Sequence, residues 1–326
     1  MNIDMIEAAA ERLAGHSRQT PLLSSPFLDD IAGRRVFLKA ESLQHTGSFK
    51  FRGAWSAVSS LSDNALKTGV VAFSSGNHAQ GVATAAAAHG AQAVIIMPAD
   101  APQTKIENTR DLGAEVVLYD RASEDRDEIG GRLSQERGLT LIKPFDDDQV
   151  IAGQGTVGLE IAQQAAQVGI ASGDVLVCCG GGGLTSGIAL ALEARAPEFR
   201  VRPVEPKGFD DVARSLSNGE ITPNASTSGS ICDAILTPAP GEKTFPHMKR
   251  LCGPGIVVPD EDCLRAMAVA FTRLRVVLEP GGAIALAAAL YHPETIVGDN
   301  VIAVASGGNV DSGVFARAIE TYGDAS

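Results

Sequence analysis

Lys50 is the residue whose type and surroundings most directly suggest chemistry. A strand is predicted over Arg35–Ala40, and a helix follows from Ser48 to Leu61 with Ser48 as its N-cap. The helix dipole disfavours a cation in the first turn, so the neutral amine is easier to reach there. A neutral lysine amine is the form that makes a Schiff base with a carbonyl compound. The sequence therefore predicts a nucleophilic lysine, with an ordinary solvated lysine as the alternative.

A run of four glycines, 180–183, is the second feature with a chemical meaning. It lies between a buried strand predicted over 175–179 and a helix that begins at Leu184. Backbone N–H groups without side chains around them can converge on an anion, and the helix dipole assists them. Ser186 stands where a dinucleotide-binding G-x-G-x-x-G pattern has its last glycine, and no Walker-type G-K-[ST] follows. The run predicts a phosphate-binding loop.

Two further loops carry polar side chains directly after predicted strands. Ser74-Ser75-Gly76-Asn77-His78 follows a strand over 70–73 and opens a helix, so its hydroxyls and N–H groups can bind a carboxylate. Ser306-Gly307-Gly308-Asn309 follows the last predicted strand, 301–305. Both loops lie where ligands of parallel sheets bind, at the carboxyl ends of strands.

The stretch 48–54 resembles the lysine motif of the pyridoxal-phosphate (PLP) serine/threonine dehydratases and serine racemases. The resemblance continues in family order through 74–78, 180–183, Glu279-Pro280 and 306–309, and it covers nearly the whole chain. Five separated motifs in one order are a strong signal, whereas each alone is weak. The resemblance implies an α/β fold of two domains, the fold type II (tryptophan synthase β-like) class of PLP-dependent enzymes, with parallel-rich sheets flanked by helices.

The same resemblance implies how the chain is divided. A discontinuous large domain, 1–52 and 147–326, is expected to bind the cofactor, and a small domain, 53–146, is expected to face the substrate, with the site between them. The acidic residues 146–148 mark the second boundary. Short apolar strands alternate with helices on both sides of it, as in parallel sheets with helical crossovers. After this boundary, the next helix is predicted only over 158–168.

The resemblance also implies cofactor contacts, with Lys50 as the Schiff-base residue and later the general base. The remaining cofactor residues are Phe49 stacked on the ring, Asn77 at the ring oxygen, Gly180, Gly181, Gly182, Gly183 and Leu184 around the phosphate, Glu279 near the ring, and Ser306 at the pyridine nitrogen. A serine hydroxyl, unlike an aspartate, does not hold that nitrogen protonated. The ring is then a weaker electron sink, which suits elimination over transamination.

On the substrate side, the resemblance implies that Ser74, Ser75, Gly76 and His78 belong to the loop that binds the substrate carboxylate. Ser75 matches the acid/base that racemases place opposite the lysine, and His78 can equally be a packing residue. Arg126 matches a racemase arginine near the mouth of the site, where a bidentate pair can bind a second carboxylate. The alternative for Arg126 is a solvated helix arginine.

Glu205 has two interpretations. It ends the next predicted strand, 22 residues after Gly183, where a dinucleotide-binding fold has its ribose-binding acid. By the family resemblance, the carboxylates of Glu205 and Asp211 and the backbone carbonyl of Phe209 instead bind Mg²⁺ or Ca²⁺, hard cations that take oxygen ligands. The family usually has a smaller residue at position 209. A solvated acidic turn is the remaining alternative.

Composition narrows the class of protein. A chain of 326 residues suits one or two domains, and its net charge of −12 argues against nucleic acid and anionic membranes as partners. No apolar run reaches the length of a membrane span. The five cysteines form no C-x-x-C pair, and Cys178 and Cys179 are interpreted as small core residues, so we expect reduced thiols and a cytoplasmic location.

The sequence thus predicts a PLP-dependent carbon–oxygen lyase that converts a β-hydroxy amino acid into a 2-oxo acid and ammonia. L-Threonine and L-serine are the expected small-molecule substrates, and a homodimer is what the resemblance suggests. The alternatives are a serine racemase that uses Ser75, a 3-hydroxyaspartate dehydratase that uses Arg126, an NAD-dependent oxidoreductase, and a non-catalytic amino-acid sensor.

Overall fold

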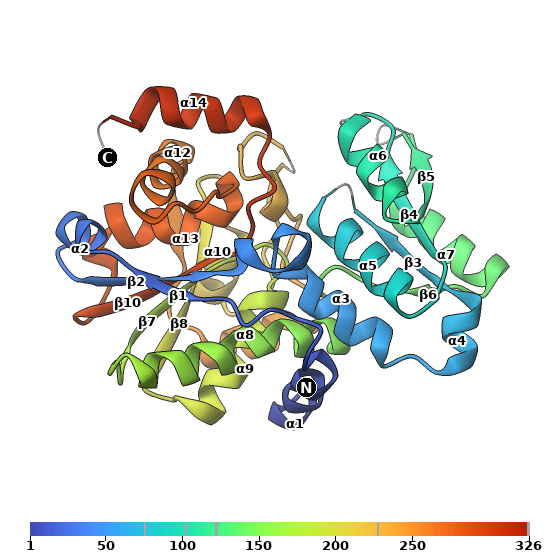
Figure 1. Ribbon diagram of the computed structural model, residues 1–326, viewed down its shortest axis with the longest axis horizontal. Helices are drawn as coiled ribbons and strands as arrows, with labels where there is room; N and C mark the ends of the chain where they lie inside the picture. Colours follow the sequence, from blue (N-terminus) through green and yellow to red (C-terminus); the bar gives the residue numbers. More distant parts are fainter. Residues whose placement is uncertain (75, 102, 121–122, 227, 325–326) are drawn as a thin grey trace.

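Two β-sheets of different size organise the chain (Figure 1). The computed structural model describes residues 1–74, 76–101, 103–120, 123–226 and 228–324. The alternation of strands and helices expected from the sequence is confirmed, since both sheets are built mainly from parallel strands with helical connections.

The larger sheet has six strands in the order β1-β2-β10-β7-β8-β9. Neighbouring strands are parallel except that β1 pairs antiparallel with β2 at one edge. The strands are β1 (Leu22–Ser24), β2 (Arg35–Ala40), β10 (Asn300–Ala305), β7 (Gly173–Cys178), β8 (Phe199–Pro206) and β9 (Ile256–Val258). Their inner positions are almost continuously buried, as is typical of a parallel sheet covered on both faces.

Helices cover both faces of this sheet (Figure 1). One pair of helices packs together on one face, namely α8 (Asp148–Gln167) and α9 (Gly183–Arg195). A second pair packs on the other face, namely α12 (Asp260–Val269) and α13 (Pro280–Tyr291). The largest hydrophobic core joins the strand interiors to these four helices.

The smaller sheet has four parallel strands in the order β5-β4-β3-β6. They are β5 (Glu115–Tyr119), β4 (Ala93–Pro98), β3 (Val70–Phe73) and β6 (Thr140–Leu141). The helices around this sheet are α4 (Asp63–Thr68), α5 (Asn77–Ala88), α6 (Gln103–Asp111) and α7 (Arg126–Arg137). Alternate strand residues face two separate cores, one shared with α5 and one with α7.

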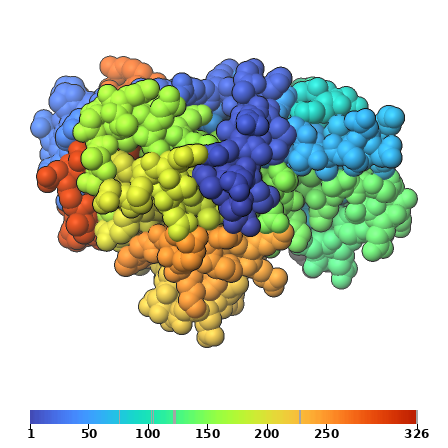
Figure 2. Space-filling view, turned by 90° about the horizontal axis from the view of Figure 1, so that it is seen from below, coloured from blue at the N-terminus to red at the C-terminus, as the bar shows by residue number. Residues whose placement is uncertain are grey.

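The helix α3 (Lys50–Ser59) connects the two sheets, because it contacts α8 on the larger side and α5 on the smaller side. The N-terminal helix α1 (Ile3–Leu13) packs on α3, α8 and α9. Figure 2 shows α1 in dark blue on the surface between the yellow-green helices and the light blue segment that follows α3. The smaller sheet lies within the predicted range 53–146, and the domain boundaries themselves stay a proposal.

Shorter elements complete the chain. They are α2 (Pro26–Ala32), α10 (Asp211–Asn218), α11 (Thr244–Leu251), α14 (Ser312–Tyr322), the 3₁₀ turns Glu41–Leu43, His45–Gly47, Asp233–Ile235 and Pro293–Thr295, and a π-helical turn Ala270–Leu274. No helix in the described part of the chain combines the length and the apolar character that crossing a lipid bilayer requires.

One predicted helix is wrong in its extent. The helix expected over 158–168 begins at Asp148, where the Asp147 side chain accepts from two backbone N–H groups as an N-cap. Glycines at 153 and 155 lower the helix propensity of this part, so the sequence pattern missed it. The glycines are used for close packing, since a methyl group at Gly153 would collide with the carbonyl oxygen of Arg52 on α3.

The predicted cap of the lysine helix is also wrong. Helix α3 begins at Lys50, preceded by Phe49 in helical conformation. Ser48 is extended and forms an isolated β-bridge with Gly307, and its buried hydroxyl has no hydrogen-bond partner among the described residues. Tertiary pairing, rather than a side-chain cap, therefore sets where the helix starts.

Candidate active site

Lys50 lies in the first turn of α3, at the junction of the two sheets. Its Nζ donates to the carbonyl oxygen of Pro144 at 2.8 Å and lies 5.2 Å from the centroid of the Phe49 ring. Burial of the amine lowers the pKa of Lys50 to about 8, although the nearby Cys178 raises it. A usable fraction of neutral amine is therefore present near neutral pH, and desolvation is its main cause.

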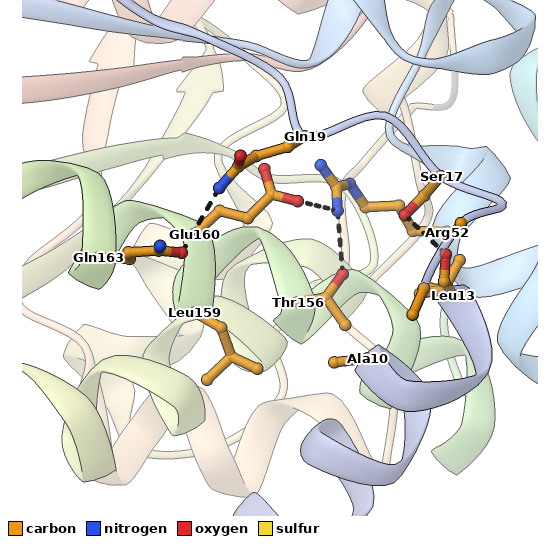
Figure 3. Close-up of a pocket in the computed structure, with 11 residues that line it drawn as sticks. Ala10, Leu13, Ser17, Gln19, Arg52, Thr156, Leu159, Glu160 and Gln163 are labelled. Atoms are coloured by element: carbon orange, nitrogen blue, oxygen red, sulfur yellow. Dashed lines mark hydrogen bonds and ion pairs between the residues drawn. The ribbon is translucent and has the colours of Figure 1, made fainter.

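A buried ionic cluster holds the start of α3 in place. The guanidinium of Arg52 makes five hydrogen bonds, including two to Glu41 at 2.8 Å and one to Glu160 at 2.7 Å. Figure 3 shows Arg52, Thr156 and Glu160 beside a cavity lined mainly by α1, the segment that follows it, and α8. The volume of this cavity is about 450 Å³. The charged groups at this cavity are already paired with protein atoms. The cluster therefore ties α3 to α8 and to the end of β2, and this fixes the position of Lys50.

The glycine run lies between β7 and α9, as predicted. Gly182 has a left-handed backbone with φ of 90°, and a methyl group there would lie 2.5 Å from the side chain of Met248. A methyl group at Gly181 would collide with the ring of Phe145. The carbonyl of Gly181 accepts from the Thr244 hydroxyl at 2.6 Å. The first N–H groups of α9 lack helical partners by geometry, so the loop presents a cradle for an anion.

Ser306 follows β10 and lies beside Cys178, the last residue of the neighbouring strand β7. The register pairs Val304 with Val177, so both strands end at the same level. Burial raises the pKa of Cys178 to about 11, although the neighbouring Ser306 side chain lowers it. Cys178 is a buried residue, as predicted, and in addition its neutral thiol borders the site near Lys50.

Glu279, Asn77 and Asn309 form a chain of hydrogen bonds across the site. The Asn77 amide donates to Oε1 of Glu279 at 2.7 Å, and the Asn309 amide donates to Oδ1 of Asn77 at 2.7 Å. Burial raises the pKa of Glu279 to about 7, although the bond from Asn77 lowers it. The predicted cofactor residues Asn77 and Glu279 are thus in direct contact, although 202 positions separate them.

The loop after β3 leads into the N-terminus of α5. Ser74 Oγ accepts from the Gly76 N–H at 3.1 Å, and Gly76 precedes the first helical residue, Asn77. Gly76 has no side chain to cap the first turn, so the N–H groups of that turn and the helix dipole are available to a carboxylate. Ser75, the predicted racemase residue, lies outside the described residues.

His78 is a buried neutral side chain. Its Nε2 lies 3.0 Å from the carbonyl oxygen of Ile142, and burial together with the charge of Lys50 lowers the pKa of His78 to about 3. Its Nδ1 is buried and has no hydrogen-bond partner among the described residues. Both interpretations of this residue, packing and substrate contact, fit this position.

Arg126 begins α7 and lies near the substrate loop. Its guanidinium lies over the ring of Phe73 at 5.1 Å, and Phe73 ends the strand that leads into Ser74. The side chain is 45% exposed, with Asp127 as a distant ionic neighbour at 3.8 Å. Among the described residues, Arg126 has no ion pair closer than the 3.8 Å contact with Asp127, and the aromatic face of Phe73 helps to position its partly solvated guanidinium.

Glu205 and Asp211 are buried together at the end of β8 and the start of α10. Both oxygens of Glu205 accept from backbone N–H groups of α10, at 2.8 and 2.7 Å. Burial and the charge of Asp211 raise the pKa of Glu205 well above its usual range, and burial raises the pKa of Asp211 to about 6. Both oxygens of Glu205 thus anchor the start of α10, and each oxygen keeps a second lone pair. Phe209 lies buried in the turn between them.

Some residues of the site were not found from the sequence. Pro144 and Phe145 lie against Lys50 and the glycine loop, and Asn309, which the sequence placed in the loop 306–309 without a role of its own, holds Asn77. The only local signal for them was their position directly after a strand. Nothing in a single sequence identifies which distant residue such a loop contacts.

The comparisons with known proteins agree with this geometry. Residues 13–307 match the family described as pyridoxal-phosphate dependent enzyme. The chain belongs to this family. An L-threo-3-hydroxyaspartate ammonia-lyase from Pseudomonas sp is 42% identical over 308 residues, which are 94% of this chain and 95% of that protein. A serine racemase from Oryza sativa subsp. indica is 38% identical over 96% of this chain and 92% of that protein.

A solved structure of a threonine deaminase from T.th. superposes with a TM-score of 0.90 at 43% identity, covering 95% of this chain and 99% of that chain. The fold type II architecture predicted from the sequence is therefore confirmed, and so is a PLP-dependent enzyme. This membership gives no support to the NAD-dependent and sensor alternatives.

The residues present fit PLP. The pKa of Lys50 is lowered, and the glycine loop packs too closely against its neighbours to accommodate side chains. The Ser306 hydroxyl, beside the neutral Cys178 thiol, is available to a ring nitrogen. In this family member, Lys50 would hold the aldehyde carbon, the loop 180–184 the phosphate, and Ser306 the ring nitrogen.

Proposed function

We propose that this PLP-dependent enzyme is an ammonia-lyase that removes the β-hydroxyl group of a β-hydroxy amino acid, with L-threonine and L-serine as its main substrates. The products are a 2-oxo acid and ammonia. The observation that carries the proposal is the lysine amine with a pKa of about 8, placed between a phosphate cradle and an uncapped helix N-terminus.

Bound PLP supplies an electrophilic carbon for the substrate amine and a ring that withdraws electrons from the substrate's α-carbon. The neutral Lys50 amine accepts the α-proton as general base, and its pKa near the working pH suits this task. The first turn of α5, after Gly76, binds the α-carboxylate through N–H groups. The Ser306 hydroxyl would hydrogen-bond the ring nitrogen without keeping it protonated. The ring is then a weaker electron sink, which favours elimination.

Replacement of Lys50 tests this assignment. Lys50→Ala should remove turnover of L-threonine and L-serine, assayed as 2-oxo acid released, and should abolish the visible absorption of bound cofactor. Lys67→Ala, an exposed lysine on α4, serves as the matched control and should keep both. Turnover at the wild-type rate in Lys50→Ala would contradict the proposal.

A second candidate, 3-hydroxyaspartate, is supported by Arg126. The guanidinium lies beside the loop that receives the α-carboxylate, and a bidentate pair with a second carboxylate is worth about 1.5–3 kcal/mol, or roughly 10- to 100-fold. Arg126→Ala should then raise KM for 3-hydroxyaspartate by about that factor and leave L-threonine unchanged. Arg132→Ala, exposed on the same helix, is the control. Equal losses on both substrates would assign Arg126 a structural role.

A serine racemase activity on the same site is the remaining alternative within the family. Its predicted acid/base is Ser75, and chiral analysis of serine recovered after partial turnover measures it directly. Accumulation of D-serine faster than 2-oxo acid would make racemisation the main reaction.

We also propose a divalent cation at Glu205 and Asp211. One oxygen of Asp211, Oδ2, is buried without a hydrogen-bond partner among the described residues, and two adjacent buried carboxyls favour a hard cation. The described residues contain no group of three His, Cys, Asp or Glu side chains suited to a metal, so the backbone carbonyl of Phe209 would have to complete the set. A chelator should lower the melting temperature of the wild type and not that of Asp211→Asn. A melting temperature unaffected by chelation argues against the cation.

Two further expectations carry over as proposals. Homodimerisation is tested by the mass that light scattering reports, and a cytoplasmic location by fractionation of the source cells.

A further inference from the structure

Asn309 occupies a special place in the chain of hydrogen bonds across the site. Its Nδ2 donates to the backbone carbonyl of Thr46 at 2.8 Å and to Oδ1 of Asn77 at 2.7 Å. Both hydrogens of this amide nitrogen are therefore used. Thr46 itself has a positive φ of 59°, which is uncommon for a residue other than glycine, and the bond from Asn309 helps to hold it.

In this chain of hydrogen bonds, the groups at the two ends, the Thr46 carbonyl and the Glu279 carboxyl, determine which atom donates at each step. A backbone carbonyl only accepts, so the Asn309 atom that faces Thr46 must be the nitrogen. That nitrogen then requires an acceptor on Asn77, which places Oδ1 toward Asn309 and Nδ2 toward Glu279. The orientation of the Asn77 amide is thus set from the Thr46 side even without the carboxylate.

The backbone around Asn309 is fixed by close contacts. A methyl group at Gly47 would lie 2.5 Å from the Asn309 Oδ1, and the Gly308 N–H donates to the Gly47 carbonyl at 2.9 Å. Gly307 lies directly under the Glu279 carboxylate, because a methyl group there would collide with Oε1. Asn309 therefore has little freedom to follow a movement of Asn77.

The other end of the chain can change its hydrogen-bonding character. The Glu279 carboxyl has a pKa of about 7, raised first by burial. Asp233 and Asp311 face it and raise this pKa further, Lys105 faces it and lowers the pKa, and the Cys178 thiol lies close by. Below this pH the carboxyl is protonated and can donate to an amide oxygen as well as accept from an amide nitrogen. If Glu279 were its only partner, the Asn77 amide could then rotate so that its oxygen and nitrogen exchange positions.

We propose that Asn309 is a positioning residue that locks the Asn77 amide in one orientation, so that its remaining N–H stays directed at the ring oxygen of the cofactor whatever the protonation state of Glu279. This inference rests on the proposed PLP-dependent function and on the contact assigned to Asn77. Its consequence is a cofactor environment that does not change with pH around neutrality.

The test follows the visible absorption of the cofactor-loaded enzyme without substrate. Wild type, Asn309→Ala and the double variant Asn309→Ala with Glu279→Gln are titrated from roughly one pH unit below to one above the Glu279 pKa of about 7. We expect a band shift with a midpoint near this pH in Asn309→Ala only, because glutamine does not titrate. Asn218→Ala, an exposed asparagine on α10, is the control and should behave as wild type.

A second variant covers the case in which the alanine variant loses the cofactor. Asn309→Asp keeps the shape but cannot donate to Asn77, so the amide should turn its nitrogen toward position 309. Its band should be displaced at every pH, in the direction that Asn309→Ala shows at low pH. Bands that match wild type in both variants, or a shift that persists in the double variant, overturn the inference. If PLP does not colour the wild type at all, the proposed function fails instead.

Discussion

Replacing Lys50 by methionine should stabilise the cofactor-free protein at neutral pH, because the fold holds an ammonium group where it is poorly solvated. Lowering the pKa of Lys50 from 10.5 to about 8 corresponds to about 3 kcal/mol, since one pKa unit is worth roughly 1.36 kcal/mol. The side chain is only half-buried, so solvent reduces this to about 2 kcal/mol. Loss of the hydrogen bond to Pro144 costs about 1 kcal/mol. The net gain expected for Lys50→Met is about 1 kcal/mol.

The pH dependence gives the sign of the effect. Between pH 8 and 10.5 the unfolded lysine still holds its proton while the folded one has lost it, so wild-type stability rises with pH relative to the variant. The advantage of Lys50→Met is therefore complete below pH 8 and lost above pH 10.5. Urea unfolding of both apoproteins across this range measures the difference, in which groups common to both cancel.

Lys39 provides the contrast. It is fully buried, but its Nζ donates to Glu160 at 2.5 Å, to the Thr20 carbonyl at 2.7 Å and to Gln164 at 2.9 Å. Lys39→Met leaves these groups without their donor and should destabilise the protein by about 3 kcal/mol or more. If Lys50→Met is less stable than wild type at pH 7, or if the difference does not shrink at high pH, desolvation is not what sets the Lys50 pKa.

Three further predictions concern glycines. Gly153→Ala should destabilise the protein by about 1–3 kcal/mol in urea unfolding, because the added methyl group meets the carbonyl oxygen of Arg52. Gly131→Ala, with open space around it on α7, should stabilise the protein by about 0.5–1 kcal/mol in the same assay. If Gly153→Ala and Gly131→Ala change the free energy of unfolding in the same direction, the packing argument is contradicted. Gly181→Ala should weaken PLP binding in a titration of the visible band, because the methyl group displaces Phe145 from the loop; unchanged affinity would mean that the loop is not the phosphate cradle.

The parts of the site that the sequence predicted are the ones that local pattern encodes. The strand before Lys50, the glycine run between β7 and α9, and the loop that opens α5 are each written in a few consecutive residues. Apolar periodicity sets strands and helices, and glycine or serine at a strand end permits backbone N–H groups to meet an anion. Such signals need no knowledge of the rest of the chain.

The parts that the sequence did not predict depend on packing. The first half of α8 is helical despite Gly153 and Gly155 because α3 and α9 pack closely on it. Ser48 was expected to cap α3, but pairing with Gly307 sets the helix start instead. In both cases a contact between distant segments outweighs a local preference of about 1 kcal/mol or less.

By itself, the sequence determined the fold class, the cofactor family and the order of the motifs, because these follow from local pattern and from resemblance. Only the tertiary structure decided the chemical state of the site. The lowered pKa of Lys50 and the raised pKa of Glu279 come mainly from burial. The direction of the Asn77 amide comes from Asn309, 232 residues away in the chain. Desolvation and hydrogen-bond direction depend on the residues that surround a group in space, and those are set when the two sheets come together.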